Sequence, residues 1–93
     1  RISPISRSAQ ARPGPSGSAA ISWAGSLDGE ARLGVYDTSG RLVREFLVRQ
    51  DRGGGVHTWD GRDRAGIPVS AGVYVLRLES GTGVASRRFT VLK

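Results

Sequence analysis

"GVHTWDGRDRAGIPVSAGVYVLRLES", residues 55–80, is the stretch that decides the fold. Two runs within it, "VHTW" and "VYVLRLES", alternate between apolar and polar residues and are separated by an interval rich in Gly and Asp. Alternation of this kind is typical of strands with one buried face, and it places Tyr74, Leu76 and Leu78 on one side of the second run. The dipeptides Asp-Gly and Ala-Gly between the runs indicate turns. We therefore predict two strands joined by an irregular loop.

The same pattern continues on both sides of this stretch. Short alternating runs occur at 19–25, 30–37 and 84–93, with a turn signal between neighbours. The run "RLVREFLVR" (41–49) has an apolar spacing that would also suit a helix, but the turn "DTSG" before it favours a hairpin. Six or seven short antiparallel strands in 93 residues predict an all-β fold, an Ig-like or fibronectin III-like β-sandwich.

Composition excludes several classes of function. The chain has 93 residues and no cysteine, so we expect one domain without disulfides or thiolate metal sites. The net charge is +6, but the arginines are scattered and lack the interleaved aromatic residues that bind nucleic acid by stacking. No apolar run approaches the roughly 20 residues of a membrane helix. We expect no nucleic-acid partner and no membrane insertion.

The N-terminal stretch differs in amino-acid composition from the rest of the chain. Residues 1–18 are rich in Ser, Pro, Gly and Arg, and Pro13-Gly14-Pro15 cannot continue a helix or a central strand. We interpret this stretch as a linker with a short extended start at residues 2–5. Because the chain begins at Arg1 and contains no Met, we also expect it to be a piece of a larger protein.

Three carboxylates form the one acidic cluster that could carry chemistry. Asp51, Asp60 and Asp63 raise the possibilities of a calcium loop or a general acid–base pair. However, Arg62 and Arg64 stand between and after the last two, where they would neutralise a cation site. We therefore predict that Asp60 caps a turn and that Asp63 pairs with an arginine, with no catalytic residue and no metal.

Two further motifs are weak as functional signals. His57 titrates near neutral pH, but no Ser or Asp stands at a spacing that marks it as a partner, so we expect a strand histidine beside Trp59. "DRGGG" (51–55) has the glycines of a phosphate-binding loop but lacks the Lys-Ser/Thr that follows in a P-loop. We expect a connection between strands and no cofactor.

The aromatic residues leave carbohydrate binding open. Trp23, Tyr36, Trp59 and Tyr74 could form a platform for sugars. Trp23 and Trp59 fall in phase with apolar neighbours or end a strand, so we expect them in the core. Tyr36 faces opposite to Leu33 and Val35 and is the best candidate for an exposed aromatic ring.

Four segments together resemble a known bacterial Ig-like module: "PGPSGSAAISWAG", "GEARLGVYDTSGRLVREFLV", "GVHTWDGRDRAGIPVSAGVYVLRLESG" and "ASRRFTVLK". The module is the sandwich part of the flagellar hook-capping protein, and it is similar to the C-terminal sorting domains of proteins exported by the type IX secretion system. The resemblance covers residues 11–93, with Gly14 where Asn is common between the two prolines.

The resemblance implies a sandwich over 11–93, a linker or extended segment over 1–10, and a strand at "RLVREFLV". It also implies that a set of turn and strand-end residues serves the fold and that none of them is catalytic. These residues are Asp37, Gly40, Trp59, Asp60, Gly61, Gly66, Gly72 and Tyr74.

From this resemblance we expect a non-enzymatic C-terminal domain of a larger secreted bacterial protein, a sorting and attachment domain that reaches the cell surface or the medium via the periplasm. The expected partners are proteins, such as a translocon, that contact the last strand. The expected contact residues are Arg87, Arg88, Phe89, Val91 and Lys93. Two alternatives stay open: a structural subunit of a hook cap or filament, with residues 1–10 adding as a strand to a neighbour, and an accessory carbohydrate-binding module of a secreted hydrolase.

Overall fold

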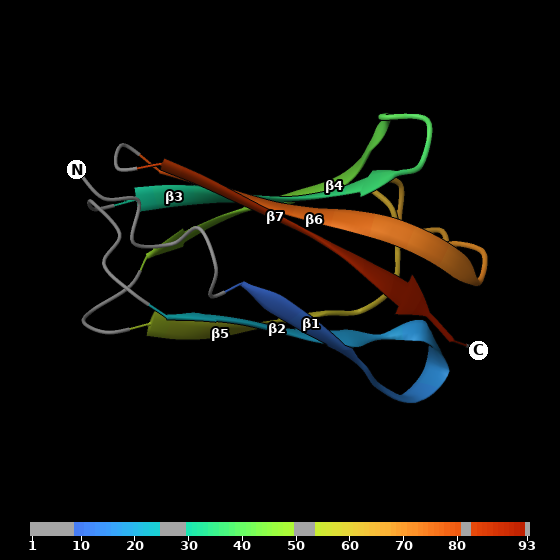
Figure 1. The fold of residues 1–93 in the computed structure, drawn as a ribbon. Helices are drawn as coiled ribbons and strands as arrows, with labels where there is room; N and C mark the ends of the chain where they lie inside the picture. Colours follow the sequence, from blue (N-terminus) through green and yellow to red (C-terminus); the bar gives the residue numbers. More distant parts are fainter. Residues whose placement is uncertain (1–8, 25–29, 50–53, 81–82, 93) are drawn as a thin grey trace.

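The computed structural model describes residues 9–24, 30–49, 54–80 and 83–92 and forms two facing antiparallel sheets (Figure 1). The elements in chain order are β1 (Gln10–Pro13), the 3-10 turn η1 (Pro15–Gly17), β2 (Ala19–Ala24), β3 (Glu30–Asp37), β4 (Leu42–Arg49), β5 (Gly54–Trp59), β6 (Gly72–Ser80) and β7 (Gly83–Val91). One sheet has the order β1-β2-β5 and the other the order β4-β3-β6-β7. The predicted all-β sandwich is confirmed, and so is the strand at 41–49.

The core lies between the sheets and is built from alternate residues of the strands. Leu33, Leu76 and Leu78 of the four-stranded sheet are fully buried. Trp59 from the other sheet is also fully buried, and its ring meets those of Tyr74 and Phe89 edge-on at 6.2 and 6.1 Å between centroids. Edge-to-face packing is a preferred geometry for aromatic pairs. The expectation that Trp23 and Trp59 fill the core is confirmed.

Strand β1 corrects the interpretation of residues 1–18 as a linker. Gln10–Pro13 pairs with β2 in regular register, Ala9 is buried and Ala11 packs against the core. The composition favoured a linker because it is polar and rich in proline. Pro13, however, ends an edge strand and Pro15 begins a 3-10 turn, and both positions tolerate a residue without a backbone N–H. Residues 1–8 lie outside the described part, so the predicted boundary between 10 and 11 stays a prediction.

The sheet edges differ in length and regularity. Strand β4 is an edge with a register shift opposite Val35 and Tyr36, where Val35 pairs with Arg44 and Tyr36 with Leu42. Strand β7 is the other edge of the same sheet, and it pairs with β6 over its whole length without a shift. Figure 1 shows β7 running obliquely from the four-stranded sheet towards the other sheet, where it contacts β1.

Candidate functional site

Two turns of the same design stand at one end of the sandwich. In "DTSGR" (37–41) the backbone N–H groups at the third and fifth positions donate to the Asp37 Oδ1 atom, at 3.0 and 2.9 Å. In "DRAGI" (63–67) the corresponding N–H groups donate to Asp63 Oδ1, at 2.9 and 3.0 Å. Each glycine N–H also donates to the carbonyl of the Asp that opens its turn. Both carboxylates therefore stabilise the backbone of their turns. The shared spacing Asp-x-x-Gly indicates this role for Asp63 from the sequence, whereas the charge pattern alone did not.

The Asp37 turn also holds its carboxylate in the ionised form. The Ser39 hydroxyl donates to Asp37 Oδ1 at 2.7 Å, and the Arg41 Nε atom lies 3.3 Å from Oδ2. The hydrogen bond from the Ser39 side chain, followed by that from the Arg41 backbone, lowers the pKa of Asp37. A carboxylate with a lowered pKa is a poor general base at neutral pH.

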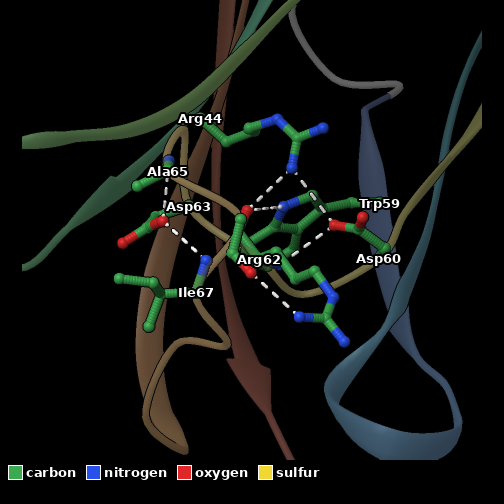
Figure 2. Close-up of polar contacts among 8 residues, drawn as sticks. Arg44, Trp59, Asp60, Arg62, Asp63, Ala65 and Ile67 are labelled. Atoms are coloured by element: carbon green, nitrogen blue, oxygen red, sulfur yellow. Dashed lines mark hydrogen bonds and ion pairs between the residues drawn. The ribbon is translucent and has the colours of Figure 1, made fainter.

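The "WDGR" loop after β5 is closed by a network centred on the carbonyl of Arg62 (Figure 2). The Trp59 indole Nε1 and the Arg44 Nη1 each donate to this carbonyl at 2.9 Å. Arg44 Nη1 also lies 3.2 Å from Asp60 Oδ1, which accepts the backbone N–H of Arg62 at 3.0 Å. Arg44 thus links β4 of one sheet to the loop that follows β5 of the other sheet. Nothing in the sequence marks this link, because its partners stand 16 to 18 residues away.

These contacts decide between chemistry and turn structure for the acidic cluster. Asp60 caps the turn, as predicted, and it also forms the ion pair with Arg44. Among the described residues Asp63 forms no ion pair, so the prediction that Asp63 pairs with an arginine does not hold there. Asp63 Oδ1 is occupied by two backbone N–H groups instead. Asp51 lies outside the described residues. Within the part of the chain that the structure describes, no group of three His, Cys, Asp or Glu residues is placed to hold a metal ion.

His57 lies on the inner face of β5, at the side where β4 closes the sandwich. Its ring partner is Phe46, with 4.2 Å between centroids, and not Trp59 as we expected. His57 and Trp59 stand two apart on β5 and so share a face of the strand, but the close contact of each ring is with a residue of the facing sheet. Burial, and then the charge of Arg44, lower the pKa of His57. The side chain is therefore a neutral, half-buried packing group at neutral pH.

Tyr74 ties the long loop to the start of β6. Its hydroxyl donates to the Ser70 carbonyl at 2.7 Å, four residues upstream, which is the geometry of the tyrosine corner of Ig-like sandwiches. Burial, and then the charge of Asp37, raise the pKa of this hydroxyl. The hydroxyl thus stays protonated and serves as a structural donor.

A groove of about 550 Å³ opens between the two Asp-x-x-Gly turns. Its lining includes Asp37 and Asp63, whose Oδ1 atoms are engaged as described above, and the buried Tyr74. Arg41 and Arg64 stand at the same groove. No nucleophile–base pair is recorded among these lining residues.

The aromatic platform for sugars is not formed. Trp23, Trp59 and Tyr74 are buried in the core, which leaves only the half-buried Tyr36 of the four candidates on the surface. The Tyr36 ring lies over Gly34 of its own strand. A single ring that covers its own backbone is not an aromatic row.

The predicted partner-binding residues divide by side-chain direction along β7. Arg87 and Arg88 are exposed, whereas Phe89 and Val91 are buried, at 6 and 1% exposure. The side chains of Phe89 and Val91 therefore anchor β7 to the core and are not available to a partner in this fold. Lys93 lies outside the described residues. The role of Arg87 and Arg88 in binding stays a prediction.

Comparison with known proteins decides the family. A family profile, the FlgD Ig-like domain, matches residues 16–84. The chain belongs to the FlgD Ig-like domain family. The Asp-x-x-Gly turns, the "WDGR" loop and the tyrosine corner described above all lie within the matched residues. No curated protein sequence matches the chain significantly.

Solved structures of the same fold include two kinds of bacterial protein. FlgD of P. aeruginosa superposes with a TM-score of 0.67 at 16% identity, over 94% of this chain and 68% of that one. FlgD of Xanthomonas campestris, a protein of hook capping in flagellar assembly, gives 0.61 at 22% identity, over 94 and 62%. PorZ, an essential surface component of the type IX secretion system of Porphyromonas gingivalis, gives 0.52 at 24% identity, over 78 and 9%. At these identities the likeness is one of fold, and this FlgD Ig-like domain spans only part of each neighbour.

The described part of the chain contains no helix that is long and apolar enough to cross a membrane.

Proposed function

We propose that this domain is a non-enzymatic protein-interaction module of a larger secreted bacterial protein, and that it acts in sorting or attachment of the type IX kind. In this proposal the domain is addressed to the cell surface or the medium via the periplasm. Its partner is a protein, such as a component of the secretion machinery. The contact is made by β7, with Arg87 and Arg88 as the charged groups.

The observation that carries the proposal is the state of β7. It stands at the edge of its sheet, and among the described residues the exposed side chains of its two arginines make no ion pair or hydrogen bond. Phe89 and Val91 hold the same strand firmly in the core, so a partner would meet a preformed surface. The family match and the likeness to PorZ support the same class of function. The share of 9% in PorZ is consistent with a module carried by a much larger protein.

A transplant tests the proposal. Residues 9–93 are fused to the end of a periplasmic reporter in a host with a type IX translocon, and the reporter is assayed outside the cell. We expect export that disappears when the translocon is deleted. The single variants Arg87→Glu and Arg88→Glu should reduce export, whereas Arg64→Glu, an equal charge change at an exposed turn position, should not. A folded reporter retained in the periplasm, or equal export of all three variants, would argue against sorting through β7.

A structural role in an extracellular assembly is a second candidate. It is favoured by the two FlgD structures, each of which aligns with 94% of this chain. Self-association of the domain at high concentration, measured by analytical ultracentrifugation, would support this role. A monomer over the whole accessible range of concentrations would count against it.

A further inference from the structure

Among the described residues, the carboxylates are confined to one part of the molecule. The sequence has eight Asp and Glu residues, of which Asp28 and Asp51 lie outside the described residues. The remaining six stand on β3, β4 and β6 or in the loop between β5 and β6. They are Glu30, Asp37, Glu45, Asp60, Asp63 and Glu79. The four other strands, β1, β2, β5 and β7, carry no carboxylate.

The recorded ion pairs follow the same division. Each joins one of these carboxylates to an arginine of β3, β4, β6 or the turn between β3 and β4. Among the described residues, the exposed Arg87 and Arg88 on β7 have no such partner. These two arginines are adjacent on an edge strand of the four-stranded sheet. Here "basic edge" means Arg87 and Arg88.

The basic edge coincides with the longest regular strand edge that the structure describes. Strand β7 has nine residues, and among the described strands it is hydrogen-bonded to β6 alone. No backbone hydrogen bond joins it to β1 in the described ranges. The other three edges are blunted, since β1 has four residues and ends in Pro13, β5 has six, and β4 contains the register shift. An edge strand with unpaired backbone groups is a template for another strand.

The arginines on this edge determine which kind of strand can pair with β7. Pairing two copies of β7 over their full length and in an antiparallel register would place the arginines of both copies near one another at the centre, and like charges on opposing strands are destabilising. A second copy of this chain is therefore disfavoured as the occupant. An extended segment with carboxylates at the matching positions gains cross-strand ion pairs instead.

Alternation defines where those carboxylates must stand. Arg87 is in phase with the buried Ala85 and Phe89, whereas Arg88 is out of phase with them, so the two arginines point to opposite faces of the sheet. Residues directly opposite on paired strands share a face. A partner strand therefore needs two consecutive acidic residues, one for each arginine, and not two acidic residues on a single face.

We propose that β7 accepts an extended acidic segment of a partner protein as an added strand, with two adjacent carboxylates opposite Arg87 and Arg88. The proposal rests on the proposed function in one respect, that β7 is the working surface. It adds the chemistry of the partner.

The test uses three nine-residue peptides of Thr and Ser, titrated into the full 93-residue chain by calorimetry. The first has two adjacent central Glu residues, and the second has the same two Glu residues separated by one residue. The third is the first peptide with alternate backbone nitrogens methylated, so that it keeps the charge but cannot pair as a strand. We expect binding of the first peptide, weakened by up to about fivefold for the second. The third should not bind measurably.

Variants locate the site. Arg88→Glu should weaken binding of the first peptide by about tenfold, because an attraction becomes a repulsion, whereas Arg64→Glu should change it by less than about twofold. Circular dichroism shows whether each variant is folded. Equal binding of the methylated peptide would overturn strand addition, and equal weakening by both variants would overturn the assignment to β7.

Heparin, as an anionic polysaccharide, is titrated in parallel. Binding of heparin without binding of any peptide would overturn the proposal in favour of a polysaccharide partner. The proposal and the proposed function fail separately. Export that depends on Arg87 and Arg88 without peptide binding would leave sorting through β7 in place and remove only the acidic strand.

Discussion

Two glycines, Gly61 and Gly66, share a left-handed backbone conformation but differ in their surroundings. Replacing each of them with Ala separates the cost of backbone strain from the cost of a steric clash. Gly61 has φ of +80° and Gly66 has φ of +83°. A Cβ atom built at Gly61 would collide with the carbonyl group of Gly17, whose carbon would lie 2.8 Å away, in the turn η1. A Cβ atom built at Gly66 meets nothing within 4 Å. Gly61→Ala should therefore be more damaging than Gly66→Ala.

The magnitudes follow from the two contributions. An L-residue in the left-handed region costs about 1–2 kcal/mol, and this cost applies to both variants. Both also lose the same unfolded-state entropy of a glycine, so that contribution cancels in the comparison. The collision with a backbone carbonyl adds the cost of overpacking, about 1–3 kcal/mol, to Gly61→Ala alone. In each variant the unfolded-state contribution offsets about 0.4–1 kcal/mol of the cost. We therefore expect Gly66→Ala to lower the free energy of unfolding by about 0–1.6 kcal/mol and Gly61→Ala by about 1–4.6 kcal/mol.

Urea denaturation followed by circular dichroism measures both values. A difference of 1 kcal/mol corresponds to a shift of about 4–8 °C in the Tm of a domain of this size, so a thermal scan should separate the two variants by at least about 4 °C. Equal losses of stability in the two variants would refute the packing of η1 against Gly61. A clear gain of stability in Gly66→Ala would refute the strain argument.

Three further predictions concern single side chains. Tyr74→Phe removes the hydrogen bond to Ser70 and should lower the free energy of unfolding by about 0.5–1.5 kcal/mol in urea melts. The pKa of His57 is lowered in the folded state, so the unfolded chain binds more protons near and below the ordinary pKa of about 6.5. The free energy of unfolding should therefore fall as pH drops through that range. In thermal scans at pH values from about 7.5 to 5.5, His57→Phe should show a weaker dependence of Tm on pH. The lowered pKa of Asp37 contributes stability above its ordinary pKa of about 3.9 that is lost as pH falls further, so acid titration of Asp37→Asn should show a smaller loss in that range than the parent chain.

Alternation predicted most of the strands because each of them buries one face. In β6 the buried residues Tyr74, Leu76 and Leu78 stand two apart, and the sequence shows this directly. Strand β1 could not be predicted in this way. It has four residues, and the pairing with β2 that stabilises it is not visible in its own composition.

The contacts of the site were predictable only where they are local. The Asp-x-x-Gly turn at Asp37 follows from its spacing, and the same spacing at Asp63 contains the same information. The contact of Arg44 with the "WDGR" loop and that of His57 with Phe46 depend on how the two sheets face each other. Neither can be derived from the strand pattern, because alternation assigns a residue to a face and not to a partner.

The position of Trp59 makes its fluorescence a probe of whether the two sheets of the domain are packed together. Its indole is fully buried and contacts rings of the opposite sheet, so its emission should be blue-shifted only while the two sheets are packed together. With Trp23→Phe, Trp59 becomes the single tryptophan of the chain. The emission maximum then reports sheet separation without a label, and it can be read on a secreted fusion whose other part lacks tryptophan.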